Sequence, residues 1–185
     1  MAQPDAKRSR LNAEIALRNT LDILTLLHST GAKAWVQDGT LLGLVRDGTV
    51  IPWDHDTDTG MFADAWTDDA HAALTAAGFS LAKALGSREN GWQHRWTRYG
   101  IKTDIFFYYR NSDGSVWHAA YVSNVQQYRF TYEREFDVAP LGTKHGAFMA
   151  PSPPEAFLVT KYGADWRVPR RRWHFARDPL NASKS

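Results

Sequence analysis

Three aspartates recur at every second position in residues 51–60, whose sequence is IPWDHDTDTG. They are Asp54, Asp56 and Asp58, and in an extended strand alternate side chains lie on one face. Three carboxylates within about 7 Å of one another repel strongly unless a cation lies between them. Magnesium prefers hard oxygen ligands and takes one or two carboxylates together with substrate phosphates. The spacing therefore predicts a Mg²⁺ or Mn²⁺ site held by Asp56 and Asp58.

An exposed acidic turn is the alternative interpretation, because Asp is a poor strand former and Asp-rich segments are usually loops. Apolar residues bracket the motif on both sides, among them Ile51, Trp53 and Met61, and they favour a place in a core element. His55 lies inside the motif, but alternation turns it away from Asp56. We expect His55 to have a structural role rather than to bind metal.

A third carboxylate, Asp104, is the only acidic residue in the apolar and aromatic run 101–109, which predicts a strand. Taken alone, Asp104 would be expected at a strand end or facing solvent. If its strand lies beside the first acidic strand, the carboxylates converge. Asp104 would then complete the metal shell or accept a proton from an attacking hydroxyl.

A glycine-containing turn precedes the acidic motif in residues 37–46, QDGTLLGLVR. Gly39 at a strand-to-helix turn would let the backbone approach a ligand, and the free N–H groups of the helix start bind phosphate. Thr40 adds a hydroxyl donor, and Arg46 adds a planar cation suited to phosphate oxygens. We predict phosphate contacts from Gly39, Thr40 and Arg46, with a surface position as the alternative for Arg46.

Other charged and aromatic residues are expected to support the site or the fold. Asp54 and Lys161 are predicted to support the site, and Lys161 and the run 170–172 are candidates for phosphate contacts, with a solvated surface as the expected alternative. Trp53 and Trp166 are expected to serve packing. Aromatic faces bind bases and quaternary ammonium groups, which makes three further residues candidates for a nucleotide or choline pocket: Trp92, Trp96 and Tyr108.

The hydrophobic periodicity predicts an α/β (mixed α+β) fold, a small mixed sheet flanked by helices, over residues 1–177, with 178–185 as a flexible tail. We expect helices at 9–29, 40–46, 64–77 and 152–162 and strands at 34–37, 53–59, 93–98 and 101–109. Within 115–150 we expect two more short strands. Ser152 has capping-box spacing to Glu155, with Pro153 at the first helical position.

The composition restricts the class of protein. The absence of cysteine excludes disulfides and thiolate-held zinc. The net charge of +2 is too small to indicate a nucleic-acid-binding protein, although Arg167, Arg177 and the run 170–172 cluster near the C-terminus. No apolar run has the length of a membrane span or the form of a signal peptide, so we expect a cytoplasmic protein.

Together the motifs resemble the LicD/fukutin family of phosphotransferases, within the nucleotidyltransferase superfamily. The resemblance is carried by DGTLLGLVR (38–46), IPWDHDTD (51–58), TDIFF (103–107), PEAFL (154–158) and YGADW (162–166), in family order. Thr57 and Thr59 depart from it, since the family often has aliphatic residues at these positions.

The resemblance implies a nucleotidyltransferase-like fold and transfer of a phospho-alcohol, such as phosphocholine or a polyol phosphate, from a CDP-linked donor to the hydroxyl of a sugar or glycan, with release of CMP. It implies that Asp56 and Asp58 hold the metal and that Asp104 is third ligand or base. Two alternatives stay open. One is nucleotidyl transfer from a nucleoside triphosphate, and the other is a non-catalytic nucleic-acid-binding module that uses the C-terminal arginines. The acidic residues argue against nucleic acid as a partner, because carboxylates would lie where phosphates must bind.

Overall fold

The computed structural model describes residues 5–185, and side chains from Ala13 onwards. The helices are α1 (Asp5–Ser29), α2 (Asp38–Arg46), α3 (Asp68–Ala76) and α4 (Pro154–Tyr162), with a short 3₁₀ helix, η1 (Ala63–Ala65). The strands are β1 (Ala34–Val36), β2 (Asp56–Phe62), β3 (Ser80–Ser87), β4 (Asn90–Arg98), β5 (Ile101–Arg110), β6 (Val116–Val122), β7 (Gln126–Tyr132), β8 (Asp137–Thr143), β9 (Gly146–Ser152) and β10 (Ala182–Lys184).

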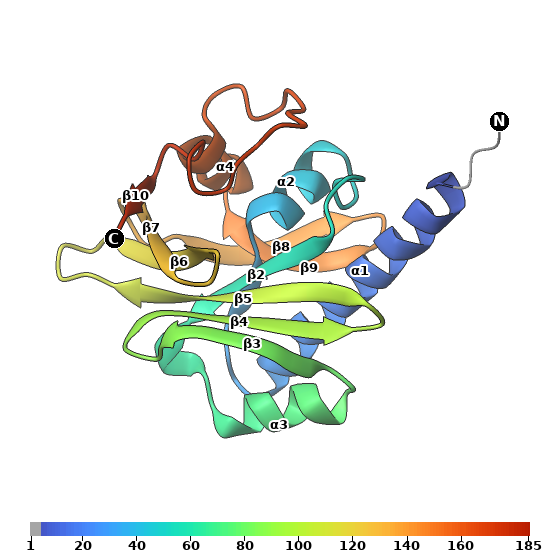
Figure 1. Ribbon diagram of the computed structural model, residues 1–185, viewed down its shortest axis with the longest axis horizontal. Coiled ribbons are helices and arrows are strands. Elements are labelled where there is room, and N and C mark those ends of the chain that lie inside the picture. Colours follow the sequence, from blue (N-terminus) through green and yellow to red (C-terminus); the bar gives the residue numbers. More distant parts are fainter. Residues whose placement is uncertain (1–4) are drawn as a thin grey trace.

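In the described part of the chain, the strands form an eight-stranded mixed sheet and a separate β8–β9 hairpin (Figure 1). Strand β5 is the centre of the large sheet. It pairs in parallel with β2, while its first part pairs with β4 and its last residues pair with β6, both antiparallel. Helix α1 packs across β1, β2 and β5, and α2 packs beside α4. This arrangement confirms the predicted mixed α/β fold.

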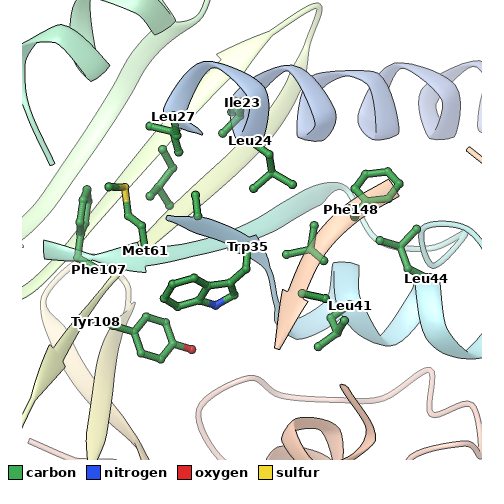
Figure 2. Close-up of a cluster of buried hydrophobic side chains, with 14 of the residues drawn as sticks. Ile23, Leu24, Leu27, Trp35, Leu41, Leu44, Met61, Phe107, Tyr108 and Phe148 are labelled. Atoms are coloured by element: carbon green, nitrogen blue, oxygen red, sulfur yellow. The ribbon is translucent and has the colours of Figure 1, made fainter. Parts of the chain in front are cut away.

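A core of apolar side chains joins α1, α2 and the sheet (Figure 2). Ile23, Leu24 and Leu27 recur at helical spacing on α1 and are buried, as their periodicity predicts. They lie above Trp35 of β1, which is completely buried and meets Tyr108 of β5 edge to face at 5.1 Å between ring centroids. Each such side chain stabilises the fold by roughly 1.5–3 kcal/mol on burial. The core thus holds β1, β2 and β5 rigidly beneath the acidic residues.

Several predicted element boundaries agree with the structure. The predicted end of the first helix at residue 29 is confirmed, and Gly31, with φ of 83°, follows it. The helix predicted at 64–77 is instead divided into η1 and α3, and α3 begins after Thr67, whose hydroxyl accepts a hydrogen bond from the backbone N–H of Ala70 at 3.2 Å. The predicted strands at 93–98 and 101–109 are β4 and β5. Tyr99 and Gly100 join them in a two-residue turn with φ of 53° and 76°.

Other predictions were wrong. Ser152 belongs to β9 and is not a helix cap; α4 begins at Pro154, and Pro153 makes no side-chain cap. Residues 182–184 are not a free tail, because β10 pairs antiparallel with β7. The region 115–150 contains β6, β7, β8 and β9 rather than two short strands, and β3 was not predicted at all. Strand β3 is largely exposed, and edge strands of this kind lack the apolar alternation by which strands are detected.

Among residues 5–185, no helix combines the length and the apolar character that a membrane crossing requires.

Candidate active site

The parallel pairing of β2 with β5 brings the predicted carboxylates together. Asp58 lies opposite Asp104, and Asp56 lies opposite Lys102. Between the aspartates, Thr57 points to the other face, where its hydroxyl is hydrogen-bonded to that of Thr103 at 2.9 Å. The alternation predicted for Asp56 and Asp58 is therefore confirmed. The buried threonines that depart from the family pattern are satisfied by cross-strand hydrogen bonds.

Asp54 is not part of the strand, contrary to the prediction. Its backbone N–H donates to the carbonyl of Ile51 at 3.0 Å in a turn that precedes β2, in keeping with the preference of Asp for turns over strands. Its carboxylate nevertheless reaches the site. A Cβ atom at Gly39 would lie 2.9 Å from Asp54 Oδ2 and 3.3 Å from Asp58 Oδ2. Both carboxylates therefore converge on Gly39.

The glycine turn at the start of α2 holds the acidic strand by its backbone. The N–H of Gly39 donates to Asp58 Oδ2 at 3.1 Å, and the N–H of Asp58 donates to the Thr40 hydroxyl at 2.8 Å. Thr40 is buried. Its hydroxyl positions β2 and does not face the site as the predicted phosphate donor. Gly39 lines the cleft, where its lack of a side chain leaves room for the two carboxylates, and its predicted phosphate contact stays a prediction.

Asp104 is already paired with two side chains that the sequence analysis did not select. Arg95 Nε donates to Oδ1 at 2.8 Å and Arg95 Nη2 donates to Oδ2 at 2.9 Å, while Gln93 Nε2 donates to Oδ2 at 3.0 Å. A usable signal existed: the two-residue turn after Arg98 fixes the β4–β5 register and places Arg95 opposite Asp104.

Lys161 of α4 is buried and forms an ion pair with Asp38, the first residue of α2. Asp38 adopts a left-handed backbone conformation with φ of 50°, and its side chain is also buried. The Lys161 ammonium lies 4.6 Å from the centroid of the Phe130 ring. The expected solvated position of Lys161 was wrong, because the pairing of distant helices α2 and α4 leaves no pattern in the sequence.

These residues enclose an acidic cleft of about 300 Å³. Its polar lining is Asp38, Gly39, Asp54, Asp56, Asp58, Gln93, Arg95, Asp104 and Lys161, and its apolar lining includes Phe106, Phe130, Tyr162, Trp173 and Phe175. The cleft therefore combines five carboxylates with two basic side chains.

The electrostatics of the cleft favour a bound cation. Loss of solvent contact raises the pKa of Asp58 well above its ordinary value, with further increases from the charges of Asp56, Asp38 and Asp104. Desolvation and the Asp104 charge raise the pKa of Asp56, and desolvation and the Asp56 charge raise that of Asp54 to about 6. Among the described side chains, no three His, Asp or Glu residues form a ready-made metal cage. A site of two carboxylates completed by substrate phosphates needs no such cage.

A second, smaller pocket of about 130 Å³ adjoins the cleft and shares Gly39, Asp54, Tyr162 and Trp173 with it. We call it the aromatic pocket; its other lining residues are Leu42, Arg46, Ile51, Trp53, Trp166, Val168, Arg170 and Arg171. Arg46 was predicted to contact phosphate, but its guanidinium is paired with Asp47 at 2.9 and 2.7 Å. Arg46 therefore lines the aromatic pocket and not the acidic cleft.

The remaining candidates lie elsewhere. Trp96 and Tyr108 are buried in the core, and Trp92 stacks on Phe107 at 4.5 Å, so the predicted aromatic substrate pocket is wrong in its residues. His55 is exposed. In the arginine cluster, Arg170 is paired with Asp165.

Residues 31–153 match the family model LicD/FKTN/FKRP, nucleotidyltransferase domain. Ribitol-5-phosphate transferase FKTN of Homo sapiens is 24% identical over 157 residues, which cover 84% of this chain and 34% of that protein. Ribitol 5-phosphate transferase FKRP of Homo sapiens is 27% identical over 157 residues, covering 80% and 31%. The chain thus spans about a third of the length of these relatives.

The structure is also similar to the crystal structure of the lincosamide antibiotic adenylyltransferase LnuA bound to lincomycin. The TM-score is 0.51 at 17% sequence identity, with 77% of this chain and 83% of the other covered. At this identity the likeness concerns the fold, which confirms the predicted nucleotidyltransferase-like architecture. With the family model matched from β1 and the glycine turn through both acidic strands, the chain belongs to the LicD/FKTN/FKRP nucleotidyltransferase-domain family.

Proposed function

We propose that the protein is a metal-dependent phosphotransferase that moves a phospho-alcohol from a CDP-linked donor to the hydroxyl of a sugar or related acceptor and releases CMP. The observation that carries this proposal is the placement of Asp56 and Asp58 on one face of β2, next to the backbone N–H of Gly39, inside a cleft with apolar walls. The names of the relatives FKTN and FKRP, ribitol-5-phosphate transferases, support the transfer of a polyol phosphate.

Asp56 and Asp58 are suited to hold Mg²⁺, or Mn²⁺, because they are close together and carry charge that no basic side chain among residues 13–185 fully balances. When bound, the ion would supply charge neutralisation at the donor diphosphate and activation of the acceptor hydroxyl. Arg95 and Lys161 line the same cleft and would orient the anionic donor.

The proposed reaction is a displacement at the phosphorus that bears the alcohol. The acceptor oxygen forms a bond to this phosphorus, and the bond from phosphorus to the bridging oxygen of CMP breaks, so CMP leaves with the electron pair. The hydroxyl proton passes to a carboxylate of the cleft. Because the donor already has a good leaving group, positioning and electrostatic stabilisation by the protein are the main requirements.

Binding and product formation test the proposal together. Thermal unfolding is recorded with CDP-ribitol, CDP-choline, CTP and ATP, each with MgCl₂ or EDTA, and CMP and pyrophosphate are then quantified by chromatography. A ligand at a hundred times its Kd stabilises by about 2.7 kcal/mol, which corresponds to a rise in Tm of roughly 5–10 °C for a chain of this size. We expect a magnesium-dependent rise with a CDP-alcohol, followed by CMP release when a sugar acceptor is added.

The other functions predict different results. A rise with triphosphates alone, with pyrophosphate as the product, would indicate nucleotidyl transfer. Binding of RNA or DNA that weakens steeply with salt and survives Asp58→Asn would indicate a nucleic-acid-binding module. Two of the clustered arginines are engaged within the chain: Arg170 is paired with Asp165, and Arg167 lies over the Trp166 ring at 4.1 Å.

A further inference from the structure

The guanidinium of Arg95 lies against the carboxylate of Asp104, where a metal ion would otherwise bind. Arg95 contacts both carboxylate oxygens, at 2.8 and 2.9 Å, in the bidentate geometry in which arginine binds carboxylates most strongly. Gln93 donates a third hydrogen bond to Oδ2 at 3.0 Å. The Asp104 side chain is only 5% exposed. A metal ion at this carboxylate would have to displace these donors.

The position of Arg95 follows from the backbone. It lies directly opposite Asp104 in the β4–β5 ladder, and the two-residue turn at Tyr99 and Gly100 fixes that register. Gln93 lies two positions earlier on β4 and therefore on the same face. The pairing of Arg95 with Asp104 is thus part of the sheet and not a chance contact between long surface side chains.

The surroundings of the two carboxylates on β2, Asp56 and Asp58, differ from those of Asp104. Asp58 accepts one hydrogen bond, from the N–H of Gly39, and within the described residues no donor is hydrogen-bonded to the carboxylate of Asp56. The ammonium of Lys161 is paired with Asp38 rather than with either residue. Asp56 and Asp58 therefore retain free oxygen lone pairs, whereas both oxygens of Asp104 are occupied.

We propose that the site takes one divalent cation, held by Asp56 and Asp58, and that Arg95 takes the place of a second cation at Asp104. This inference rests on the metal dependence in the proposed function. The sequence-based role of Asp104 as third ligand or base is replaced by a role as the positioning residue for Arg95. The guanidinium has five N–H donors, and those not used by Asp104 can bind the donor's phosphate oxygens.

Counting bound Mn²⁺ tests this directly. The loss of the free Mn²⁺ signal in electron paramagnetic resonance is titrated against the wild-type chain, with and without saturating CDP. Four variants are compared: Arg95→Met, Arg95→Lys, Asp104→Asn and, as a control in an ion pair outside the cleft, Arg110→Met. Far-UV circular dichroism establishes that each variant is folded.

We expect one Mn²⁺ per chain for wild type, Arg95→Lys, Asp104→Asn and Arg110→Met, and a second Mn²⁺ only for Arg95→Met. Two ions in the wild type, or loss of the single ion in Asp104→Asn, would overturn the inference while leaving the metal-dependent function intact. A folded Arg95→Met variant that still binds one ion would also overturn it. No Mn²⁺ bound to the wild type under either condition would remove the metal from the proposed function, and the inference with it. If Arg95→Met does not fold, Asp104→Asn and the wild-type count decide the matter.

Discussion

Asp58 of β2 and Asp104 of β5 lie directly opposite each other across a parallel pair of strands. On the reverse face, the neighbouring residues Thr57 and Thr103 are joined by a hydrogen bond, and the Thr59 hydroxyl donates to the carbonyl of Asp104 at 3.0 Å. The separation of the two carboxylates is therefore set by buried backbone and side-chain contacts. A site built on strands in this way is held more precisely than one built on loops.

Asp58→Asn should stabilise the protein in the absence of metal and should abolish its response to metal and donor. The charge of Asp58 is unfavourable without a cation, since burial and neighbouring carboxylates raise its pKa well above the ordinary value. In EDTA the variant should unfold at a higher temperature than wild type, whereas MgCl₂ and donor should no longer raise its Tm. CMP release should fall by about 10²-fold or more. Asp64→Asn, at an exposed ion pair with Arg110, is the control and should change neither property. A lower Tm for Asp58→Asn in EDTA would contradict the expected repulsion.

Gly39→Ala should impair activity without unfolding the protein. The added Cβ would lie 2.9 Å from Asp54 Oδ2 and 3.3 Å from Asp58 Oδ2, so both carboxylates must shift. Displacements below 1 Å in an active site can lower the rate substantially, and we expect a loss of about tenfold or more in CMP release. Gly142→Ala is the matched control, because no atom lies within 4 Å of its added Cβ. Full activity of Gly39→Ala, measured beside this control, would show that the close approach of the two carboxylates to Gly39 is not required for CMP release.

Lys161→Met should strongly destabilise the fold. It leaves the buried carboxylate of Asp38 without its partner, and breaking a buried ion pair in this way costs about 3–5 kcal/mol. The double variant Asp38→Asn/Lys161→Met should recover more than half of that loss, as measured by urea unfolding. Lys144→Met, at an exposed position, should stay within about 0.5 kcal/mol of wild type. Additive effects of the two substitutions would mean that the ion pair is not coupled in solution.

Two buried histidines should each make the protein less stable as the pH falls from about 6.5 to 4. His94 and His118 are buried, and burial lowers the pKa of each to about 4. In this pH range the unfolded chain binds more protons than the folded one, so each histidine lowers the free energy of unfolding by about 1.4 kcal/mol per pH unit. Asp54, Asp56 and Asp58 act in the opposite direction, because burial raises the pKa of each carboxyl group. Urea unfolding at several pH values should show that the slope of the free energy of unfolding against pH is less positive by about 1.4 kcal/mol per pH unit in His94→Phe than in wild type. An unchanged slope would show that His94 is protonated in the folded state.

The sequence was sufficient for the part of the site that depends on local periodicity. Alternation placed Asp56 and Asp58 on one face, and the β-prone surroundings of Asp104 placed it in a strand. The partners of these residues depend on pairing between elements. Arg95 could have been found from the length of the β4–β5 turn, but the contact of Lys161 with Asp38 depends on how two helices from opposite ends of the chain pack together.

The predicted positions of Asp54 and Thr40 differ from those in the structure because of contacts with nearby backbone. The chain forms a turn at Ile51, which keeps Asp54 out of β2, and the Thr40 hydroxyl accepts a hydrogen bond from the backbone of β2. The C-terminal residues 182–184 carry little apolar character, yet they pair with β7 because the exposed edge of that strand offers unused backbone hydrogen-bonding groups.

The parallel pairing of β2 with β5 also has a consequence for how the protein acquires its function during folding. Thr57 and Thr103 lie 46 positions apart, and α3, β3 and β4 lie between them in the chain. The carboxylate face therefore forms only when this long loop is closed, and the closure costs conformational entropy that the contacts between the strands must offset. A ligand that recognises this face selects chains in which the crossover is complete, and it raises the population of that native state by mass action.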